Sequence, residues 1–254
     1  MLSDVQMERY SRHIILPEIG MAGQRKLLSA KVLAIGAGGL GSTAIMSLAA
    51  AGVGKIGIAD FDRVDLSNLQ RQIIHATNDI GKPKAVSAAE TVRALNPEIE
   101  TAVLAEAVTE MNIRELVRDY DFVLDCTDRF EMKFLVNDAC VLERKAFCHA
   151  GVLRFYGQMM TFVPGSVCYR CVFKGPPPRE FAPNCRQAGV FGPLVAAMGA
   201  LQAAEAVKFI LGKGELLAGR LLTIDAATMN VKTVTLPPRS AACPVCGGQP
   251  TISF

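Results

Sequence analysis

The stretch Lys31-Val-Leu-Ala-Ile-Gly-Ala-Gly-Gly-Leu-Gly41 decides the fold. Its first half is a short apolar run that predicts a buried β-strand, and its second half is a Gly-x-Gly-x-x-Gly turn. The small apolar residues from Leu40 to Ala51 predict a helix directly after the turn. Glycines in such a turn allow backbone N–H groups to approach a phosphate at the positive end of the helix. The stretch therefore predicts a strand, turn and helix that bind a nucleotide.

Short apolar runs alternate with helical patterns on both sides of this stretch. Up to residue 156, strands are expected at 31–36, 55–60, 99–104, 121–126 and 146–152, with helices at 83–95, 109–118 and 130–144. This alternation predicts an α/β fold with a Rossmann-like, doubly wound parallel sheet. Later in the chain, strands are expected at 157–163, 221–225 and 231–236, with one long helix at 193–211. We read residues 1–254 as one domain, with a nucleotide-binding half at 1–156 and a mostly antiparallel extension at 157–254.

The composition excludes several classes of protein. The 254 residues carry 27 Lys+Arg against 24 Asp+Glu, a formal charge of +3, and 50% are hydrophobic. Disorder is not expected from such a chain, and the mixed charges do not predict nucleic-acid binding. The polar N-terminus does not resemble a signal peptide, and we expect no membrane-spanning segment. We therefore expect a cytoplasmic protein, in which the 8 cysteines stay reduced and need an explanation other than disulfides.

Charged residues that follow the glycine turn indicate which nucleotide it binds. Asp60 ends the second expected strand, where an acid can hold ribose hydroxyls. Asn68 and Arg71 follow it in a polar run, and Lys84 lies in the first turn of the next helix. A lysine there is unfavourable by about 0.3–1 kcal/mol, because its charge opposes the helix dipole. A bound polyphosphate makes the same charge favourable. The glycine turn alone fits NAD or FAD equally well, but these residues together favour a triphosphate.

A carboxylate after the strand at 121–126 is a candidate magnesium ligand. Asp128 follows the carboxyl end of that strand, where doubly wound sheets bind ligands, and carboxylates hold the Mg²⁺ that a triphosphate carries. Asp125 is the alternative, but its place inside the strand favours a structural role.

Two Cys-x-x-Cys pairs predict a metal site. They are Cys168–Cys171 and Cys243–Cys246, separated by 72 positions. Four thiolates suit tetrahedral zinc. Closing so long a loop costs about 4 kcal/mol, whereas structural zinc contributes about 10–16 kcal/mol. A redox-active pair is the alternative reading.

The other cysteines and the histidines carry weaker signals. Cys185 lies beside Arg186, which can favour a thiolate nucleophile, but an ordinary loop thiol fits the sequence equally well. Cys126, Cys140 and Cys148 lie in apolar segments and are expected in the core. His149 is expected to be a core histidine rather than a base, and no Ser-His-Asp triad is visible.

Taken together, these motifs resemble the MoeB/ThiF/HesA family of ubiquitin-activating-type adenylyltransferases. The likeness runs from Glu8 to Gly248. It rests on Arg-Tyr-Ser-Arg at 9–12, the glycine turn, Ala-Asp-Phe-Asp at 59–62, Ser-Asn-Leu-Gln-Arg-Gln at 67–72, Gly-Lys-Pro-Lys at 81–84, Asp-Cys-Thr-Asp at 125–128 and both cysteine pairs.

The resemblance implies ATP-dependent adenylylation of a ubiquitin-like sulfur carrier of the ThiS/MoaD type, on its C-terminal Gly-Gly carboxylate. It implies that Arg12 reaches the triphosphate of the partner subunit in a homodimer, and that a separate protein supplies persulfide sulfur. The implied ATP-site residues are Gly39, Asp60, Ser67, Asn68, Arg71, Lys84, Asp128 and Arg129, with Mg²⁺ on Asp128 and Zn²⁺ on the four paired cysteines.

The resemblance also implies that Cys185 joins covalently to the carrier, as in ThiF members. Two departures concern the substrate: Arg129 stands where the family more often has Asn, and Lys133 where Arg is common. The motifs fit thiamine and molybdopterin synthesis alike. An NAD- or FAD-dependent oxidoreductase and a non-catalytic carrier-binding scaffold are the competing hypotheses.

Overall fold

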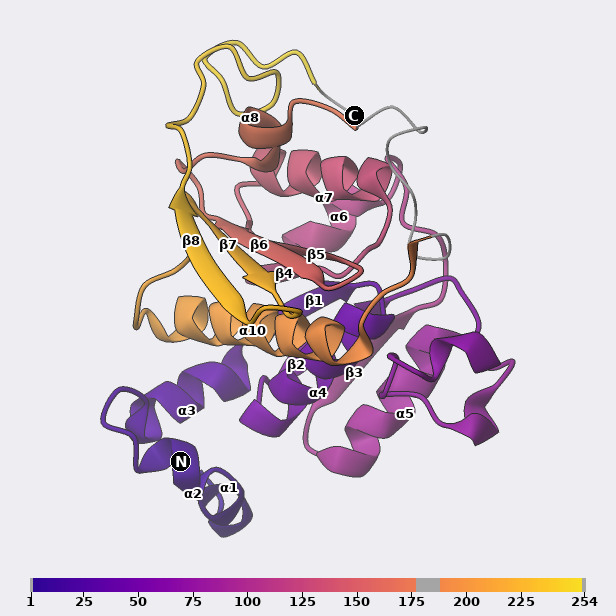
Figure 1. The fold of residues 1–254 in the computed structure, drawn as a ribbon. Helices are drawn as coiled ribbons and strands as arrows, with labels where there is room; N and C mark the ends of the chain where they lie inside the picture. Colours follow the sequence, from indigo (N-terminus) through magenta and orange to yellow (C-terminus); the bar gives the residue numbers. More distant parts are fainter. Residues whose placement is uncertain (1, 177–187, 253–254) are drawn as a thin grey trace.

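A mixed β-sheet forms the centre of the protein (Figure 1). The computed structural model describes residues 2–176 and 188–252. Within them the strands lie in the order β3-β2-β1-β4-β5-β6-β7-β8. Their bounds are β1 Lys31–Ile35, β2 Lys55–Ala59, β3 Glu100–Leu104, β4 Phe122–Asp125, β5 Ala146–Leu153, β6 Tyr156–Phe162, β7 Arg220–Asp225 and β8 Asn230–Thr235.

The first five strands are parallel and the last three antiparallel. β1 pairs with β2 and β4, β2 with β3, and β4 with β5, all in parallel. β5 to β8 then pair in sequence as antiparallel neighbours. The predicted parallel half with its antiparallel extension is confirmed. From β1 the chain first adds β2 and β3 on one side and then adds β4 and β5 on the other. At such a switch point the carboxyl ends of the neighbouring strands β1, β2 and β4 border the crevice in which doubly wound sheets bind ligands.

Helices cover both faces of the sheet (Figure 1). α3, α4, α5 and α10 lie on one face, and α6, α7 and α8 on the other. Successive residues of β1 accordingly enter different cores, since Val32 and Ala34 pack in the first and Leu33 and Ile35 in the second. The helices are α1 Asp4–Arg9, α2 Ser11–Ile14, α3 Gly20–Ser29, α4 Gly39–Ala51, α5 Lys84–Leu95, α6 Ile113–Arg118, α7 Phe130–Leu142, α8 Tyr169–Phe173 and α10 Gly192–Leu211, with short 3₁₀ turns η1 Leu66–Asn68 and η2 Thr77–Asp79. A strand buried on both faces explains why the opening stretch is apolar throughout.

The long helix α10 packs closely against α4. A Cβ atom added at Gly199 would lie 2.2 Å from the backbone oxygen of Leu40 and from the Thr43 hydroxyl. Thr43 in turn donates a hydrogen bond to the backbone oxygen of Ala196 at 2.8 Å. α10 has a mean hydropathy of 1.6 over an 18-residue window, enough by length and composition to cross a membrane, but half of that window is buried inside the protein. A core helix gives the same signal.

The helices differ from the sequence-based expectation in several places. α5 begins at Lys84 because Pro83 is its N-cap, with an extended ψ of 132°. α6 begins at Ile113, four residues later than predicted, because the Asn112 side chain closes a turn on the Thr109 amide at 2.8 Å. One helix was not expected from the sequence: α8 lies between the strand expected at 157–163 and the long helix, and its first residue, Tyr169, is buried.

Candidate functional site

The glycine turn joins β1 to α4 through two positions that only glycine can occupy. Gly36 has φ of +101°, and a Cβ atom there would lie 2.8 Å from the Cys126 backbone oxygen. A Cβ atom at Gly41 would lie 2.0 Å from the Gly36 oxygen. Gly39 is the first residue of α4, so the free N–H groups of the helix point to the crevice. The predicted strand, turn and helix are confirmed.

Asp60 lies against the glycine turn. Its carboxylate accepts hydrogen bonds from the Ala37 amide at 2.8 Å and the Asp62 amide at 2.9 Å. Burial raises the pKa of Asp60, an effect that the nearby positive charge of Lys84 opposes. The acid at the end of β2 is therefore part of the turn, close enough to meet a nucleoside bound there.

Lys84 enters the same region as a buried cation. Residues 62–65 run beside 81–84, so that the Lys84 amide donates to the Asp62 backbone oxygen at 2.9 Å. The Lys84 ammonium pairs with the Asp62 carboxylate at 3.0 Å and is 7% exposed, whereas Asp62 is half exposed. A buried cation at the first residue of a helix is electrostatically unfavourable for the fold. Its position beside the glycine turn suits a phosphate ligand.

The polar run after Asp62 folds into η1 and brings Arg71 to the turn. Asn68 accepts the Asp65 amide through its side-chain oxygen, and the Ser67 amide donates to the Asp65 carboxylate. The Arg71 guanidinium donates to the Ser67 backbone oxygen at 3.2 Å. A Cβ atom on Gly39 would lie 3.5 Å from the Arg71 side chain. Four segments therefore meet here: the glycine turn, the end of β2, η1 and the start of α5.

The loop after β4 borders this group. Asp128 and Arg129 are both exposed. The Arg129 guanidinium lies 5.8 Å above the ring centre of Phe61, which follows Asp60 directly. Asp125, in contrast, is completely buried and holds an ion pair with Lys133 at 3.3 Å. Of these two carboxylates, Asp128 is therefore the one that remains available to an ion.

Arg12 lies far from the other predicted residues of its own chain. Its neighbour Tyr10 packs on Gly52, the C-cap of α4, and His13 contacts Gln24, which donates to the Ala51 backbone oxygen. Gly39 begins the same helix of 13 residues, and such a helix is about 20 Å long. Arg12 and the glycine turn thus lie at opposite ends of α4.

Sequence reasoning missed two buried side chains at the turn. His75 contacts the Ala37 backbone oxygen at 3.0 Å and the Ser87 hydroxyl at 2.8 Å, and so joins the glycine turn to α5. Gln72 approaches Gly38, and its buried side-chain oxygen has no hydrogen-bond partner among the described residues. No local pattern in the sequence indicates the contact of His75 with Ala37, because the two residues lie 38 positions apart. The polar run at 67–72 was the only signal for Gln72.

The four paired cysteines form one cluster. Their sulfur atoms all lie within 4.8 Å of one another. Cys168 lies 3.8 Å from Cys171 and 3.6 Å from Cys243, and Cys171 lies 3.4 Å from Cys246. A tetrahedron with zinc–sulfur bonds of 2.3 Å has sulfur–sulfur edges of about 3.8 Å, so the cluster fits zinc. In Figure 1 the C-terminal segment accordingly runs beside α8.

The remaining cysteines differ in their surroundings. Cys126, Cys140 and Cys148 are buried, and burial raises the pKa of each thiol, which makes them unreactive core residues. Cys185 and its neighbour Arg186 lie outside the described residues.

Known proteins share this architecture. The crystal structure of E. coli MccB with ATP superposes with a TM-score of 0.81 at 27% identity, covering 94% of this chain and 74% of that one. MccB with MccA-N7isoASN gives 0.83 at 26% identity, over 97% and 76% of the two chains.

Curated relatives are more similar in sequence. The SAMP-activating enzyme E1 of Haloferax volcanii is 46% identical over 97% of this chain and 91% of its own length. The sulfur carrier protein adenylyltransferase of Thermus thermophilus is 44% identical, over 97% and 93%. The adenylyltransferase and sulfurtransferase MOCS3 of Bos taurus is 43% identical over 99% of this chain but 56% of its own. The ThiF family model matches residues 10–245, and the chain therefore belongs to the ThiF family.

Proposed function

We propose that this protein is an ATP-dependent adenylyltransferase for a ubiquitin-like sulfur carrier. The observation that carries the proposal is the buried ammonium of Lys84 beside Asp60 and the glycine turn. The competing hypothesis of a dinucleotide-dependent oxidoreductase predicts no dependence of activity on Lys84 or Arg71. The relatives named as a SAMP-activating E1 and a sulfur carrier protein adenylyltransferase support the same reaction.

The reaction joins the carrier's C-terminal Gly-Gly carboxylate to AMP. A carboxylate oxygen attacks the α-phosphorus of ATP, the bond to the β-phosphate oxygen breaks, and the acyl-adenylate and pyrophosphate form. Asp60 and Gly39 hold the nucleoside, and the cations of Arg71 and Lys84 hold the phosphates. Such a reaction requires positioning and charge neutralisation rather than a general base.

Further side chains complete the proposed site. Ser67 and Asn68 form the wall that carries Arg71, and Arg129 adds a positive charge where the carrier tail enters. Asp128 would hold Mg²⁺, which neutralises charge on the triphosphate when bound. We propose that Arg12 reaches the triphosphate from the partner subunit of a homodimer, since within one chain it lies at the wrong end of α4.

The second half of the chain has a supporting role in the proposal. Zinc on Cys168, Cys171, Cys243 and Cys246 pins the C-terminal segment to α8, and these thiolates stay reduced in the cytoplasm, where we place the protein. Residues 1–156 bind the nucleotide and 157–254 the carrier, within one domain. We propose that Cys185 joins covalently to the carrier: its thiolate attacks the carbonyl carbon of the acyl-adenylate, the bond to AMP breaks, and a thioester forms. The persulfide of a separate donor protein then attacks this thioester and releases the Cys185 thiolate. Mass spectrometry should detect the adduct, and Cys185→Ser should abolish it.

ATP–pyrophosphate exchange tests the function. We expect exchange with carriers that end in Gly-Gly, and none with the same carriers lacking the last glycine. Exchange that is absent with every carrier, together with tight NADH binding, would establish the oxidoreductase instead. Carrier binding without exchange would indicate a scaffold.

A further inference from the structure

A buried carboxylate that the proposed reaction does not use lies three residues before Asp128. One oxygen of Asp125 accepts the Thr127 amide at 3.1 Å and the Thr127 hydroxyl at 2.7 Å. The other accepts His149 Nδ1 at 2.9 Å and Lys133 Nζ at 3.3 Å. The turn that leads to Asp128 is therefore held by this carboxylate, which is itself held from β5 and α7.

The charges of Asp125, Lys133 and His149 determine which of their atoms donate hydrogen bonds. Burial alone would raise the pKa of Asp125, but the Lys133 charge and the hydrogen bond from His149 outweigh it and hold the pKa below its ordinary value. Burial, and next the charge of Lys133, lower the pKa of His149 to about 4. At neutral pH the ring carries one proton, which Nδ1 donates to Asp125.

The second nitrogen of His149 makes this arrangement costly. Its Nε2 is buried and has no hydrogen-bond partner among the described residues. A buried unpaired acceptor destabilises a fold, so its presence requires a reason other than stability. Orientation of Asp125 is a reason that the geometry supplies.

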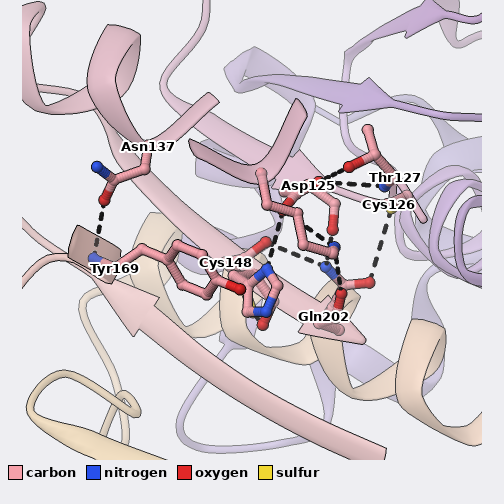
Figure 2. A network of polar contacts seen from close by, with 10 residues as sticks. Asp125, Cys126, Thr127, Asn137, Cys148, Tyr169 and Gln202 are labelled. Atoms are coloured by element: carbon pink, nitrogen blue, oxygen red, sulfur yellow. Dashed lines mark hydrogen bonds and ion pairs between the residues drawn. The ribbon is translucent and has the colours of Figure 1, made fainter. Parts of the chain in front are cut away.

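The ring of His149 also contacts the zinc knuckle, by which we mean the Cys-x-x-Cys segment from Cys168 to Cys171. Tyr169, which lies between the ligands Cys168 and Cys171, packs its ring 4.5 Å from the ring of His149. The Tyr169 amide donates to the Asn137 side chain at 2.8 Å, and the residue is 1% exposed. Figure 2 shows Tyr169, Asp125 and Thr127 from left to right. Asp125 is the last residue of β4.

We infer that the zinc knuckle positions the Asp128 loop through Tyr169, His149 and Asp125. The inference rests on the proposed function, in which Asp128 meets magnesium and ATP. His149 is then a positioning residue, since it acts on the nucleotide site only through Asp125. Loss of the Tyr169 ring allows the histidine to move, removes a donor from Asp125 and loosens the turn at Thr127.

The experiment compares variants of the full-length, zinc-loaded protein. Tyr169→Leu and His149→Leu break the contact, and His149→Asn keeps an N–H donor near the position of Nδ1. Phe173→Leu is the matched control, because the Phe173 ring also lies 4.5 Å from that of Tyr169, whereas the ring that packs on His149 is that of Tyr169 itself. Each variant is measured for zinc content, for hydrogen–deuterium exchange at residues 126–131, and for the KM values of magnesium–ATP and carrier.

Provided that one zinc per chain is retained, we expect faster hydrogen–deuterium exchange at residues 126–131 in Tyr169→Leu and His149→Leu than in the wild type. Their KM for magnesium–ATP should rise about tenfold, as for a lost hydrogen bond to a charged group, with the KM for carrier unchanged. His149→Asn should restore both values, and Phe173→Leu should change neither.

Unchanged exchange at 126–131 in Tyr169→Leu, or an equal change in Phe173→Leu, would overturn the inference. If His149→Leu does not fold, Tyr169→Leu and His149→Asn still test the inference, each compared with Phe173→Leu at one zinc per chain. Hydrogen–deuterium exchange does not depend on enzymatic activity. A wild-type protein that shows no ATP–pyrophosphate exchange would therefore refute the proposed function and leave the test of the inference intact.

Discussion

At the scale of single residues, Asp125 and Asp128 show how position decides chemistry. The two carboxylates lie three residues apart, but Asp125 is buried on Lys133 and Asp128 is exposed. The sequence already favoured Asp128 as the magnesium ligand, because Asp125 falls inside the expected strand. The ion pair with Lys133 was not predictable, since it depends on how α7 lies over β4.

We predict opposite effects for the two alanine variants. Asp128→Ala should reduce pyrophosphate exchange at least about a thousandfold and change the free energy of unfolding by less than about 0.5 kcal/mol, because the side chain is exposed. Asp125→Ala should destabilise the fold by about 3–5 kcal/mol, since it leaves the buried Lys133 charge unpaired. Exchange assays and urea unfolding measure both. Near-normal exchange by Asp128→Ala would show that another group holds the ion.

His149 should make stability depend on pH. Its pKa is about 4 in the fold and 6.5 in the unfolded chain, so between these values the unfolded chain binds more protons. The free energy of unfolding should therefore fall as the pH drops from 6.5 towards 4, by at most about 1.4 kcal/mol per pH unit from this residue. His149→Asn should flatten the slope in urea unfolding at pH 7, 6 and 5. The remaining slope belongs partly to His75, whose pKa burial also lowers. An unchanged slope would contradict the assignment.

At the scale of elements, the contact between α4 and α10 supports the nucleotide turn. Gly39 starts α4 and lies against Val195 of α10: a Cβ atom there would be 2.6 Å from the Val195 side chain. Gly199 allows the same close approach one turn later. Periodicity predicted both helices, but their contact joins segments more than 150 positions apart and has no local signal.

We predict that Gly199→Ala destabilises the fold although alanine favours helices. The helix propensity gains about 1 kcal/mol, but the new methyl group meets the Leu40 backbone oxygen, and overpacking costs about 1–3 kcal/mol or more. Because the methyl group would lie 2.2 Å from a backbone oxygen, the cost falls at the upper end of this range, and we expect a net loss of about 2 kcal/mol in urea unfolding and a weaker affinity for ATP. Ala197→Ser, on the exposed side of α10, is the control and should change stability by less than about 0.5 kcal/mol. Equal stabilities of the two variants would show that α4 and α10 can move apart enough to accommodate the methyl group.

At the scale of the whole molecule, the cysteine cluster joins segments 72 positions apart, and Arg12 lies apart from the nucleotide turn. Both observations concern contacts that no single element makes. The cluster was predictable from sequence because a Cys-x-x-Cys pair is a local signal that occurs twice.

Zinc removal should release the C-terminal segment. We expect one zinc per chain by metal analysis, and a chelator should lower the Tm and speed hydrogen exchange in residues 240–252. Cys246→Ser should begin at the lower Tm and respond little to the chelator. A metal-free protein with the wild-type Tm would contradict the four-thiolate site.

Arg12 provides a test of the homodimer. If each site takes Arg12 from the partner, Arg12→Ala and Asp128→Ala are each inactive alone. Mixed dimers then contain one complete site, and random mixing should recover about a quarter of the wild-type exchange. No recovery, after size-exclusion and mass measurements show that mixed dimers form, would exclude a partner role for Arg12.

The sequence by itself determined the alternation of strands and helices, the glycine turn, the switch from parallel to antiparallel strands, and the cysteines that cluster. Each of these features can be predicted from the spacing or periodicity of residues that are close in the sequence. Only the tertiary structure decided that Arg71 lies beside Gly39 and Lys84 beside Asp60, that Arg12 lies at the far end of α4, and that Tyr169, His149 and Asp125 lie in contact. The physical reason is that parallel strands bring their carboxyl ends together only after long crossovers, and no local pattern records which side chains then meet.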